Sequence, residues 1–424
     1  MKEDFLHFVW KNRLFQHDSL VANTGEKIKV LRLGEHNFDA GPDFFNAKVE
    51  IDGTLWVGNV EIHVNASDWA RHGHHKDKNY DNVILQAVYN NDTDVKRTNG
   101  EPVPTVELKF NPSIYQNYQE LLQNQYWIPC QNDFYKVDPF FVKHWLHKLM
   151  IERLERKSNE IIACLEKNKN DWEETFYQFL ARNFGFKTNS QPFELLAKSL
   201  PYKFLIKHKN SLIQIEAMLL GQAGLLQYAL SDDYTKILDR EYKVFSKKFS
   251  LRHIDGHLWK FLRLRPSNFP TIRIAQFGSL IHKTSGLFSK IIQAGNAKEL
   301  LELFRVSTSP YWENHYVFNK ESEHKEKKLG DQAIHYILIN TVVPFLFVYG
   351  KIKNLDDFKE KSLEILDQIP PESNSIVKKW EKLGIKAENA FYTQALLQLK
   401  NEYCKFRKCI QCRIGNKILK SEKV

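Results

Sequence analysis

The sequence has little of what marks secreted, membrane-spanning or nucleotide-hydrolysing proteins. Its 424 residues include only five cysteines, an odd number that does not pair into a disulfide framework. No Gly-rich phosphate loop, dinucleotide fingerprint or nucleophile elbow is present, which argues against ATP-driven and nicotinamide-dependent chemistry. The N-terminal residues lack the pattern of a signal peptide, so we expect a cytoplasmic protein with reduced thiols.

Long hydrophobic runs are also missing. The most apolar stretch, residues 336–348, is shorter than a bilayer span and contains Asn340 and Pro344, so it predicts a buried helix and no membrane partner. A hydrophobic content of 42% is enough for folded cores, and the net charge is +10. This basic excess suits phosphate-rich partners, and we expect nucleic acid to be one. The composition indicates no oligomeric state.

Hydrophobic periodicity divides the chain into a strand-rich part and a helical part. An amphipathic helix pattern at 4–16 precedes five strand-like segments, at 27–33, 45–51, 55–64, 83–89 and 103–108. From about residue 140 the period is helical. We therefore expect an α+β protein with a mixed β-sheet domain over 1–115 and a linker over 116–139. A large all-α domain over 140–424 would carry the C-terminal cysteines.

The second and third strand-like segments form a predicted hairpin that carries the most informative side chains. Asp43 precedes the first of these strands, and Glu61 and His63 lie on the second. A two-residue turn at Asp52-Gly53 would pair Asp43 with Ile62 and leave Glu61 and His63 on the other face. A three-residue turn with a bulge would pair Asp43 with His63 and gather all three side chains, as a divalent metal requires.

This hairpin resembles the PD-(D/E)XK nuclease superfamily, in which an Asp begins the second core strand and an acid-x-lysine follows on the third. The resemblance covers roughly residues 4–110 and implies a restriction-endonuclease-like sheet. It also implies that Asp43 and Glu61 hold Mg²⁺ or Mn²⁺ for phosphodiester hydrolysis, with Glu35 as a further carboxylate at the site. His63 stands where the superfamily has lysine, and it is expected to act as a base or a ligand.

Metal-capable side chains also crowd the segment after the third strand. Asp68, His72, His74 and Asp77 fall within ten residues. They could line the rim of the hairpin site and contact substrate phosphates, or bind Zn²⁺ as a separate hydrolase centre. A polar loop or a capped helix start explains the same pattern without a ligand. We favour the role at the rim.

An arginine-rich segment is the second distinctive feature. Arg263, Arg265 and Arg273 lie within 11 residues of one another, together with Asn268 and two prolines. A helix pattern follows, so these side chains could clamp a phosphate beside a helix N-terminus. They could equally brace neighbouring helices through ion pairs with acids. The sequence leaves both interpretations open.

Three cysteines cluster near the end of the chain. Cys404, Cys409 and Cys412 could bind Zn²⁺ with a fourth thiolate, for which Cys130 is the expected source. An iron–sulfur cluster is a second interpretation, because some PD-(D/E)XK nucleases carry one with a similar distribution of cysteines. Unligated buried cysteines are the third. Cys164 follows a helical apolar stripe and is expected to be core.

Over its whole length the chain also resembles a bacterial domain-of-unknown-function family. The shared segments are residues 41–44, 58–63 and 68–69, then His72, His74 and Asp77, residues 265–270, Arg273 and the C-terminal cysteines. This likeness implies no activity. We expect a metal-dependent nuclease; the alternatives are an inactive nucleic-acid-binding or scaffold protein that keeps the fold, and a zinc hydrolase.

Overall fold

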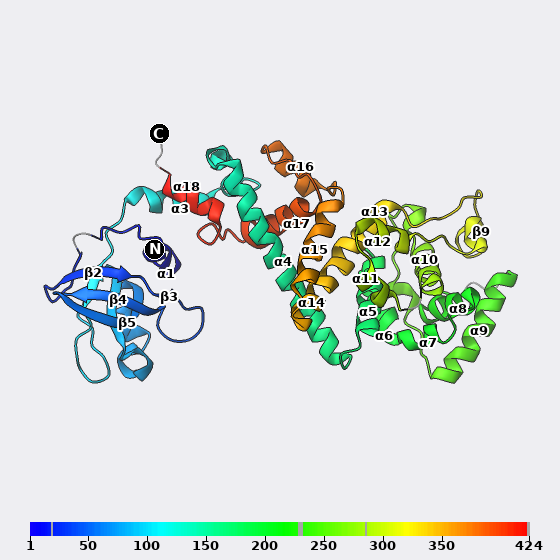
Figure 1. Ribbon diagram of the computed structural model, residues 1–424, viewed down its shortest axis with the longest axis horizontal. Coiled ribbons are helices and arrows are strands. Elements are labelled where there is room, and N and C mark those ends of the chain that lie inside the picture. The colour runs from blue at the N-terminus through cyan, green and yellow to red at the C-terminus, as the bar shows by residue number, and fades with distance from the viewer. Residues whose placement is uncertain (18–19, 228–231, 285, 422–424) are drawn as a thin grey trace. The chain divides into compact units, whose positions relative to one another are not determined.

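The computed structural model describes residues 1–17, 20–227, 232–284 and 286–421. Contacts divide the chain into two compact units (Figure 1). The first unit combines residues 1–145 with residues 400–424, and the second holds residues 146–399. The C-terminal cysteines therefore belong with the β-sheet and not with the helical part, which differs from the predicted domain boundaries.

The first unit is built on one mixed sheet that follows a short helix, α1 (Glu3–Lys11). The strand order is β1-β2-β4-β5-β6-β7, with β3 paired to β4. The strands are β1 (Leu20–Val21), β2 (Lys27–Arg32), β3 (Glu35–His36), β4 (Phe44–Ile51), β5 (Thr54–Asn65), β6 (Val83–Asn90) and β7 (Thr105–Glu107). The five strands predicted from periodicity are confirmed as β2, β4, β5, β6 and β7.

Strand direction changes at β5, the central strand. β2, β4 and β5 pair antiparallel, whereas β5, β6 and β7 pair parallel. A parallel connection needs a crossover, and the segment between β5 and β6 supplies it. It contains α2 (Asp68–Arg71) and two short 3₁₀ turns, His74–Lys76 and Lys78–Tyr80. The polar segment is thereby placed beside β5.

Close packing between β5 and β6 requires glycine at position 58. A Cβ there would lie 2.4 Å from Ile84 Cγ2 and 2.7 Å from the Asn82 carbonyl oxygen. Helix α1 packs against β5, and its apolar residues Phe5, Leu6 and Val9 are fully buried. His7, on the polar face of the same helix, contacts Asp43, which directly precedes β4.

The segment predicted as a linker is packed structure. Asn111 caps helix α3 (Pro112–Gln123) by accepting from Ser113 N–H, and Tyr118 of that helix stacks on Phe5 at 5.0 Å. A 3₁₀ helix follows at Gln131–Lys136. The C-terminal helix α18 (Arg413–Lys420) contacts α3, and Asn117 donates to the Leu419 carbonyl. The prediction missed α3, whose buried residues Ile114, Tyr118 and Leu121 are interspersed with polar residues.

The second unit is helical, as predicted. Its helices are α4 (Pro139–Lys167, which begins in the first unit), α5 (Trp172–Phe184), α6 (Ser190–Ser199), α7 (Tyr202–Ile206), α8 (Leu212–Gln222), α9 (Asp233–Phe249), α10 (Pro270–Lys283), α11 (Leu287–Gln293), α12 (Ala297–Phe304), α13 (Asp331–Ile337), α14 (Val343–Lys353), α15 (Asp356–Gln368), α16 (Ser375–Lys382) and α17 (Ala390–Gln398). A small hairpin, β8 (His315–Val317) and β9 (Lys320–Glu321), interrupts them. π-helical turns lie at Leu338–Val342 and Leu399–Cys404.

Among the residues that the structure describes, one helical run is long and apolar enough to cross a membrane. It spans Asp331–Lys353, and 78% of its most apolar window is buried inside the fold. A core helix of this kind passes the same length and composition test as a membrane span. Its burial agrees with the buried helix predicted from residues 336–348.

Candidate functional site

The hairpin of β4 and β5 brings Asp43 beside Glu61 through a bulge in β4. Ile51 pairs with Thr54, so the turn is the two-residue Asp52-Gly53 loop. The register then shifts by one residue between Phe44 and Ala47, and Phe44 pairs with Val60. Neither register derived from the turn alone is therefore correct, because the extra residue lies inside the strand. Asn46 adopts φ 56° there, a conformation that asparagine tolerates.

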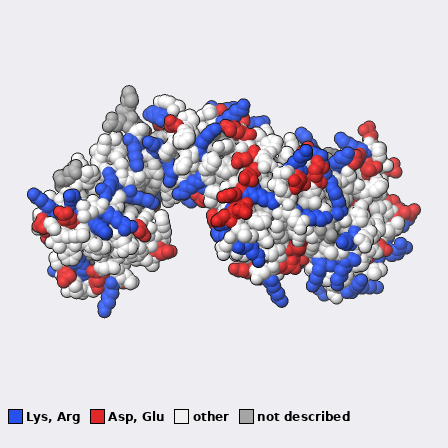
Figure 2. Space-filling view, viewed as in Figure 1, with Lys and Arg blue, Asp and Glu red and all other residues white. Residues whose placement is uncertain are grey.

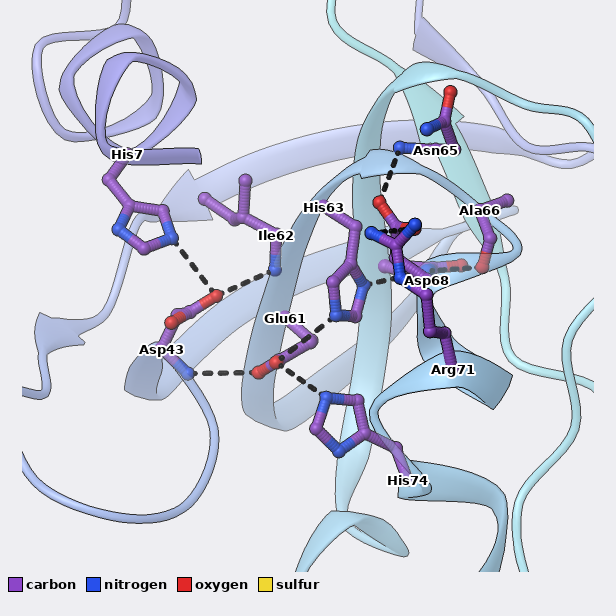
Figure 3. A network of polar contacts seen from close by, with 11 residues as sticks. His7, Asp43, Glu61, Ile62, His63, Asn65, Ala66, Asp68, Arg71 and His74 are labelled. Atoms are coloured by element: carbon purple, nitrogen blue, oxygen red, sulfur yellow. Dashed lines mark hydrogen bonds and ion pairs between the residues drawn. The ribbon is translucent and has the colours of Figure 1, made fainter. Parts of the chain in front are cut away.

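Two reciprocal hydrogen bonds join Asp43 to the strand opposite. Its backbone N–H donates to Glu61 Oε2 at 3.0 Å, and its own Oδ2 accepts from Ile62 N–H at 2.9 Å. Figure 3 shows both carboxylates between the two strands. These bonds place Asp43 beside Glu61 in a register that differs from both predicted ones. The convergence of the two carboxylates on a metal ion stays a prediction.

Glu61 is the buried member of the pair. Its side chain is 7% exposed, whereas that of Asp43 is 22% exposed. Burial, with the nearby charge of Asp43, raises the pKa of Glu61 above its ordinary value. The carboxylate faces two imidazoles, with Oε1 at 3.2 Å from His74 Nε2 and 3.6 Å from His63 Nε2. Because burial disfavours the ionised form of Glu61, a positively charged partner would stabilise its carboxylate.

His63 lies on the same face as Glu61 and is 1% exposed. The Gln86 side-chain amide approaches its Nδ1 at 3.0 Å and also donates to the Ala66 carbonyl, while Gln86 Oε1 accepts from the Thr105 hydroxyl. This orientation of the amide makes His63 Nδ1 an acceptor and leaves the ring proton on Nε2, toward Glu61.

The same environment keeps His63 uncharged. Burial, with the nearby His74 and His72, lowers the pKa of His63 to about 3. His63 therefore supplies no positive charge to this group of side chains at neutral pH. Its Nε2 faces Glu61 Oε1 at 3.6 Å and makes no hydrogen bond within the described part of the chain.

Three imidazoles gather at this end of the sheet. His63, His72 and His74 each offer a nitrogen, and the three nitrogens lie within 4.8 Å of one another. His74 stacks on Tyr80 at 3.8 Å, and burial raises the pKa of Tyr80 to about 12, so its hydroxyl stays protonated. His72 is exposed, which opens the group to solvent.

Helix α1 contributes two side chains that the sequence did not predict. His7 Nε2 lies 3.1 Å from Asp43 Oδ2. Burial alone would lower the pKa of His7, but the hydrogen bond and charge of Asp43 raise it. Glu3, one helical turn earlier, has a pKa raised by burial and lies close enough to interact with His72 and Asp43. The sequence signal that could have identified them is the i, i+4 spacing of Glu3 and His7, which places both on the polar face of an amphipathic helix.

Three predicted residues serve other purposes. Glu35 is exposed on β3 and pairs with Arg32 at 2.7 Å. Asp68 is buried, but its carboxylate accepts from Asn65 N–H and pairs with Arg71 (Figure 3). Asp77 caps a 3₁₀ turn by accepting from Asn79 N–H. The trio of His72, His74 and Asp77 is therefore replaced by three histidines.

The arginine-rich segment lies in the helical unit. Arg263 and Arg265 are exposed, whereas Arg273 is 8% exposed on α10. Asn268 accepts from Arg273 Nη2 at 2.6 Å. On the face seen in Figure 2, Lys and Arg are interspersed with Asp and Glu over this unit. Of the four predicted substrate contacts in this segment, only Arg273 is buried, and Arg263, Arg265 and Asn268 are exposed.

The four predicted cysteine ligands all belong to the first unit and lie near enough to one another to interact electrostatically. Cys404 interacts electrostatically with Cys130, Cys409 and Cys412. Cys130 also interacts with Cys409 and Cys412. Cys130, Cys409 and Cys412 are buried and all four thiols are free. Burial and the neighbouring Cys412 raise the pKa of Cys409 to about 12. Backbone N–H groups of Ile414 and Gly415 point to the Cys412 sulfur.

Both side-chain groups have the chemistry of metal ligands. Nε2 of His74 and Nε2 of His63 are buried beside Glu61 without a well-aligned hydrogen bond. Carboxylate oxygens mixed with imidazole nitrogens suit Mn²⁺ or Zn²⁺ better than Mg²⁺, which prefers oxygen ligands. Four thiols suit Zn²⁺ or an iron–sulfur cluster.

Residues 3–375 match the model of a family described as a protein of unknown function (DUF2851). No curated protein and no solved structure matches the chain significantly.

Proposed function

The chain belongs to this family, whose description assigns no activity, and from the site we propose that the protein is a metal-dependent nuclease. The observation that carries the proposal is the pairing of Asp43 with Glu61 on adjacent strands, with His63 on the same face. The order of α1, β2, β4, β5, α2 and β6 supports a restriction-endonuclease-like sheet. That order agrees with what the PD-(D/E)XK resemblance implies.

Asp43, Glu61 and His74 are the residues that would hold the metal ion. When bound, such an ion would lower the pKa of a water molecule and offset charge on the phosphate in the transition state. Mn²⁺ fits the mixed oxygen and nitrogen donors better than Mg²⁺. Its charge would also compensate the buried Glu61 carboxylate.

The other side chains position these ligands. His7 contacts Asp43 from α1 and holds its carboxylate against the Ile62 N–H. The chain of Thr105, Gln86 and His63 orients the His63 Nε2 proton toward Glu61. Because His63 is neutral, it supplies no charge to the site. Partner residues of this kind are often nearly as important as the ligands themselves.

Cleavage assays with varied metals and nucleic acids test the proposal. Single-stranded and duplex DNA and RNA are incubated with Mn²⁺, Mg²⁺ or Zn²⁺ and the full chain. We expect cleavage to be strongest with Mn²⁺ and to fall at least about 100-fold in Asp43→Asn and Glu61→Gln. Glu35→Gln is the matched control, since Glu35 is an exposed acid paired with Arg32. Equal cleavage by the wild type and both site variants would refute the proposal.

A catalytically inactive nucleic-acid-binding protein is the second candidate. The observation that favours it is the neutral His63 in place of a lysine cation. Such a protein would bind nucleic acid with an affinity that falls steeply with salt, and no metal would produce cleavage. A zinc hydrolase based on His72, His74 and Asp77 is not supported, because Asp77 caps a turn.

We also propose a structural metal centre at Cys130, Cys404, Cys409 and Cys412. Three of these residues are close to the C-terminus, and Cys130 follows α3. A metal bound by all four would tie the last segment of the chain to the rest of the first unit. This role is independent of catalysis at Asp43 and Glu61.

A further inference from the structure

A buried arginine without a counter-ion lies in the helical unit. Arg273, in the first turn of α10, is 8% exposed. Its Nη1 donates to Gln276 Oε1 at 2.9 Å and its Nη2 to Asn268 Oδ1 at 2.6 Å. Its Nε is buried without a hydrogen-bond partner. The guanidinium is therefore held in place by neutral groups and retains one unused donor.

Within the described parts of the chain, no carboxylate forms an ion pair with Arg273. Burial lowers the pKa of Arg273 to about 10, so the side chain is still charged at neutral pH. Burying a charge without a partner is costly, and proteins seldom retain such a charge without a use for it.

The guanidinium lines a cavity of about 620 Å³. This volume lies in the range of small-molecule sites. Other lining residues are Phe186, Asn189, Asn268, His335 and Tyr336. Two acids also reach the cavity wall, but Asp331 pairs with Arg305 at 3.8 Å and Glu372 accepts from Gln394 and Thr393. Each acid of the cavity lining thus has a partner of its own, and neither forms an ion pair with Arg273.

Aromatic rings form the floor beside the arginine. The Arg273 guanidinium lies 4.6 Å over the Phe186 ring, and the Tyr336 ring lies 4.9 Å from Phe186. Phe186 adopts φ 49°, which is a strained conformation for a bulky residue. The cation and the two aromatic rings therefore lie side by side in the lining of the cavity.

We propose that this cavity binds a nucleotide, with a phosphate group at Arg273 and the base against the aromatic floor. Nη1 and Nη2 of Arg273 each donate one hydrogen bond to a neutral side chain, and their remaining protons would bind phosphate oxygens. The N-terminus of α10 adds the positive end of a 14-residue helix at Pro270, which also lines the cavity. The proposal rests on the helical unit and does not depend on nuclease activity.

Calorimetric titration of the full chain with adenosine monophosphate, adenosine and inorganic phosphate tests the site. We expect the monophosphate to bind, and adenosine without its phosphate to bind at least about 10-fold more weakly. Equal binding of adenosine and its monophosphate would overturn the role of Arg273, as would no binding of any phosphate compound. A dinucleotide with a 5′-phosphate distinguishes a free nucleotide from the end of a nucleic-acid chain, since only an open-ended site accepts both.

Matched arginine variants identify the residue responsible. Arg273→Gln should weaken binding of the monophosphate by about 10- to 100-fold, because a charge-assisted hydrogen bond is lost. Arg240→Gln, at an exposed arginine on α9, should leave it unchanged. Asn268→Ala removes an exposed side chain that holds Arg273, and it should weaken binding several-fold even if Arg273→Gln does not fold. Unchanged affinity in both Arg273→Gln and Asn268→Ala would overturn the proposal.

Discussion

The backbone N–H of Asp43 donates to the carboxylate of Glu61 across two strands, at 3.0 Å. This contact exists because β4 has two residues between Phe44 and Ala47, whereas β5 has only one between their partners Val60 and Gly58. Without the extra residue, the two-residue turn would place Asp43 opposite Ile62. The side chains of Asp43 and Glu61 would then point to opposite faces of the sheet. A single bulge therefore creates the candidate site.

Deletion of Asn46 should dismantle the site while leaving the hairpin paired. The deletion removes the extra residue, and the regular register then turns Asp43 to the face opposite Glu61. We expect the affinity for Mn²⁺ to fall at least about 10-fold, measured by calorimetry, with a β-sheet circular dichroism signal preserved. Asn46→Gly is the control, since glycine keeps the residue count and accepts φ 56°. Unchanged affinity in the deletion variant would contradict this account.

Replacement of Gln86 should alter the proton position on His63. In the structure Gln86 makes His63 Nδ1 an acceptor, so nitrogen NMR should find the proton on Nε2 at pH 7. Gln86→Leu leaves Nδ1 and the Thr105 hydroxyl without this partner, which should lower the free energy of unfolding by about 1–3 kcal/mol. Metal affinity or cleavage should fall by about 10- to 100-fold. A wild-type spectrum with the proton on Nδ1 would show that the assigned amide orientation is wrong.

The stability of the protein should fall in acid because His63 is held neutral. Its pKa is lowered to about 3 when folded, against about 6.5 in an unfolded chain. Between these values the unfolded chain binds a proton that the folded chain does not, so stability falls as the pH drops below about 6.5. The slope from this residue is at most about 1.4 kcal/mol per pH unit. The pKa of Glu61 is raised in the folded chain, so the contribution of Glu61 to stability decreases as the pH rises above 4.5.

Urea unfolding from pH 7 to pH 4 isolates the contribution of His63. His63→Gln should show a shallower decline of stability than the wild type, because glutamine does not titrate. His257→Gln, at an exposed histidine of the helical unit, should decline like the wild type. Parallel pH profiles for all three proteins would mean that His63 does not titrate differently in the two states.

Removal of metal should destabilise the first unit through its cysteines. Metal analysis of the purified chain should find either one zinc, or iron with acid-labile sulfide and visible absorbance. A Cys412→Ser variant should lose that metal and unfold at a lower temperature. Cys164→Ser is the matched control, because Cys164 belongs to the second unit and the other four cysteines belong to the first. Metal-free protein with unchanged stability would leave the four cysteines as ordinary core.

Much of the fold could be predicted because its signals are local. Alternation of apolar residues marked β4, β5 and β6, and the Asp52-Gly53 pair marked the turn between two of them. The extra residue at Asn46 has no such signal, since a bulge depends on how the partner strand and Asn59 accommodate it. The contribution of His7 was missed for the same reason, because it depends on where α1 packs.

The sequence by itself determined the residue types at the site and the elements that carry them, since hydrophobic period and turn chemistry act over a few residues. Only the tertiary structure decided which of these side chains meet. It joined Asp43 to Glu61, turned Glu35 and Asp77 to other partners, and brought Cys130 to three cysteines at the far end of the chain. Strand register and helix packing set these contacts, and both are settled by burial over the whole unit.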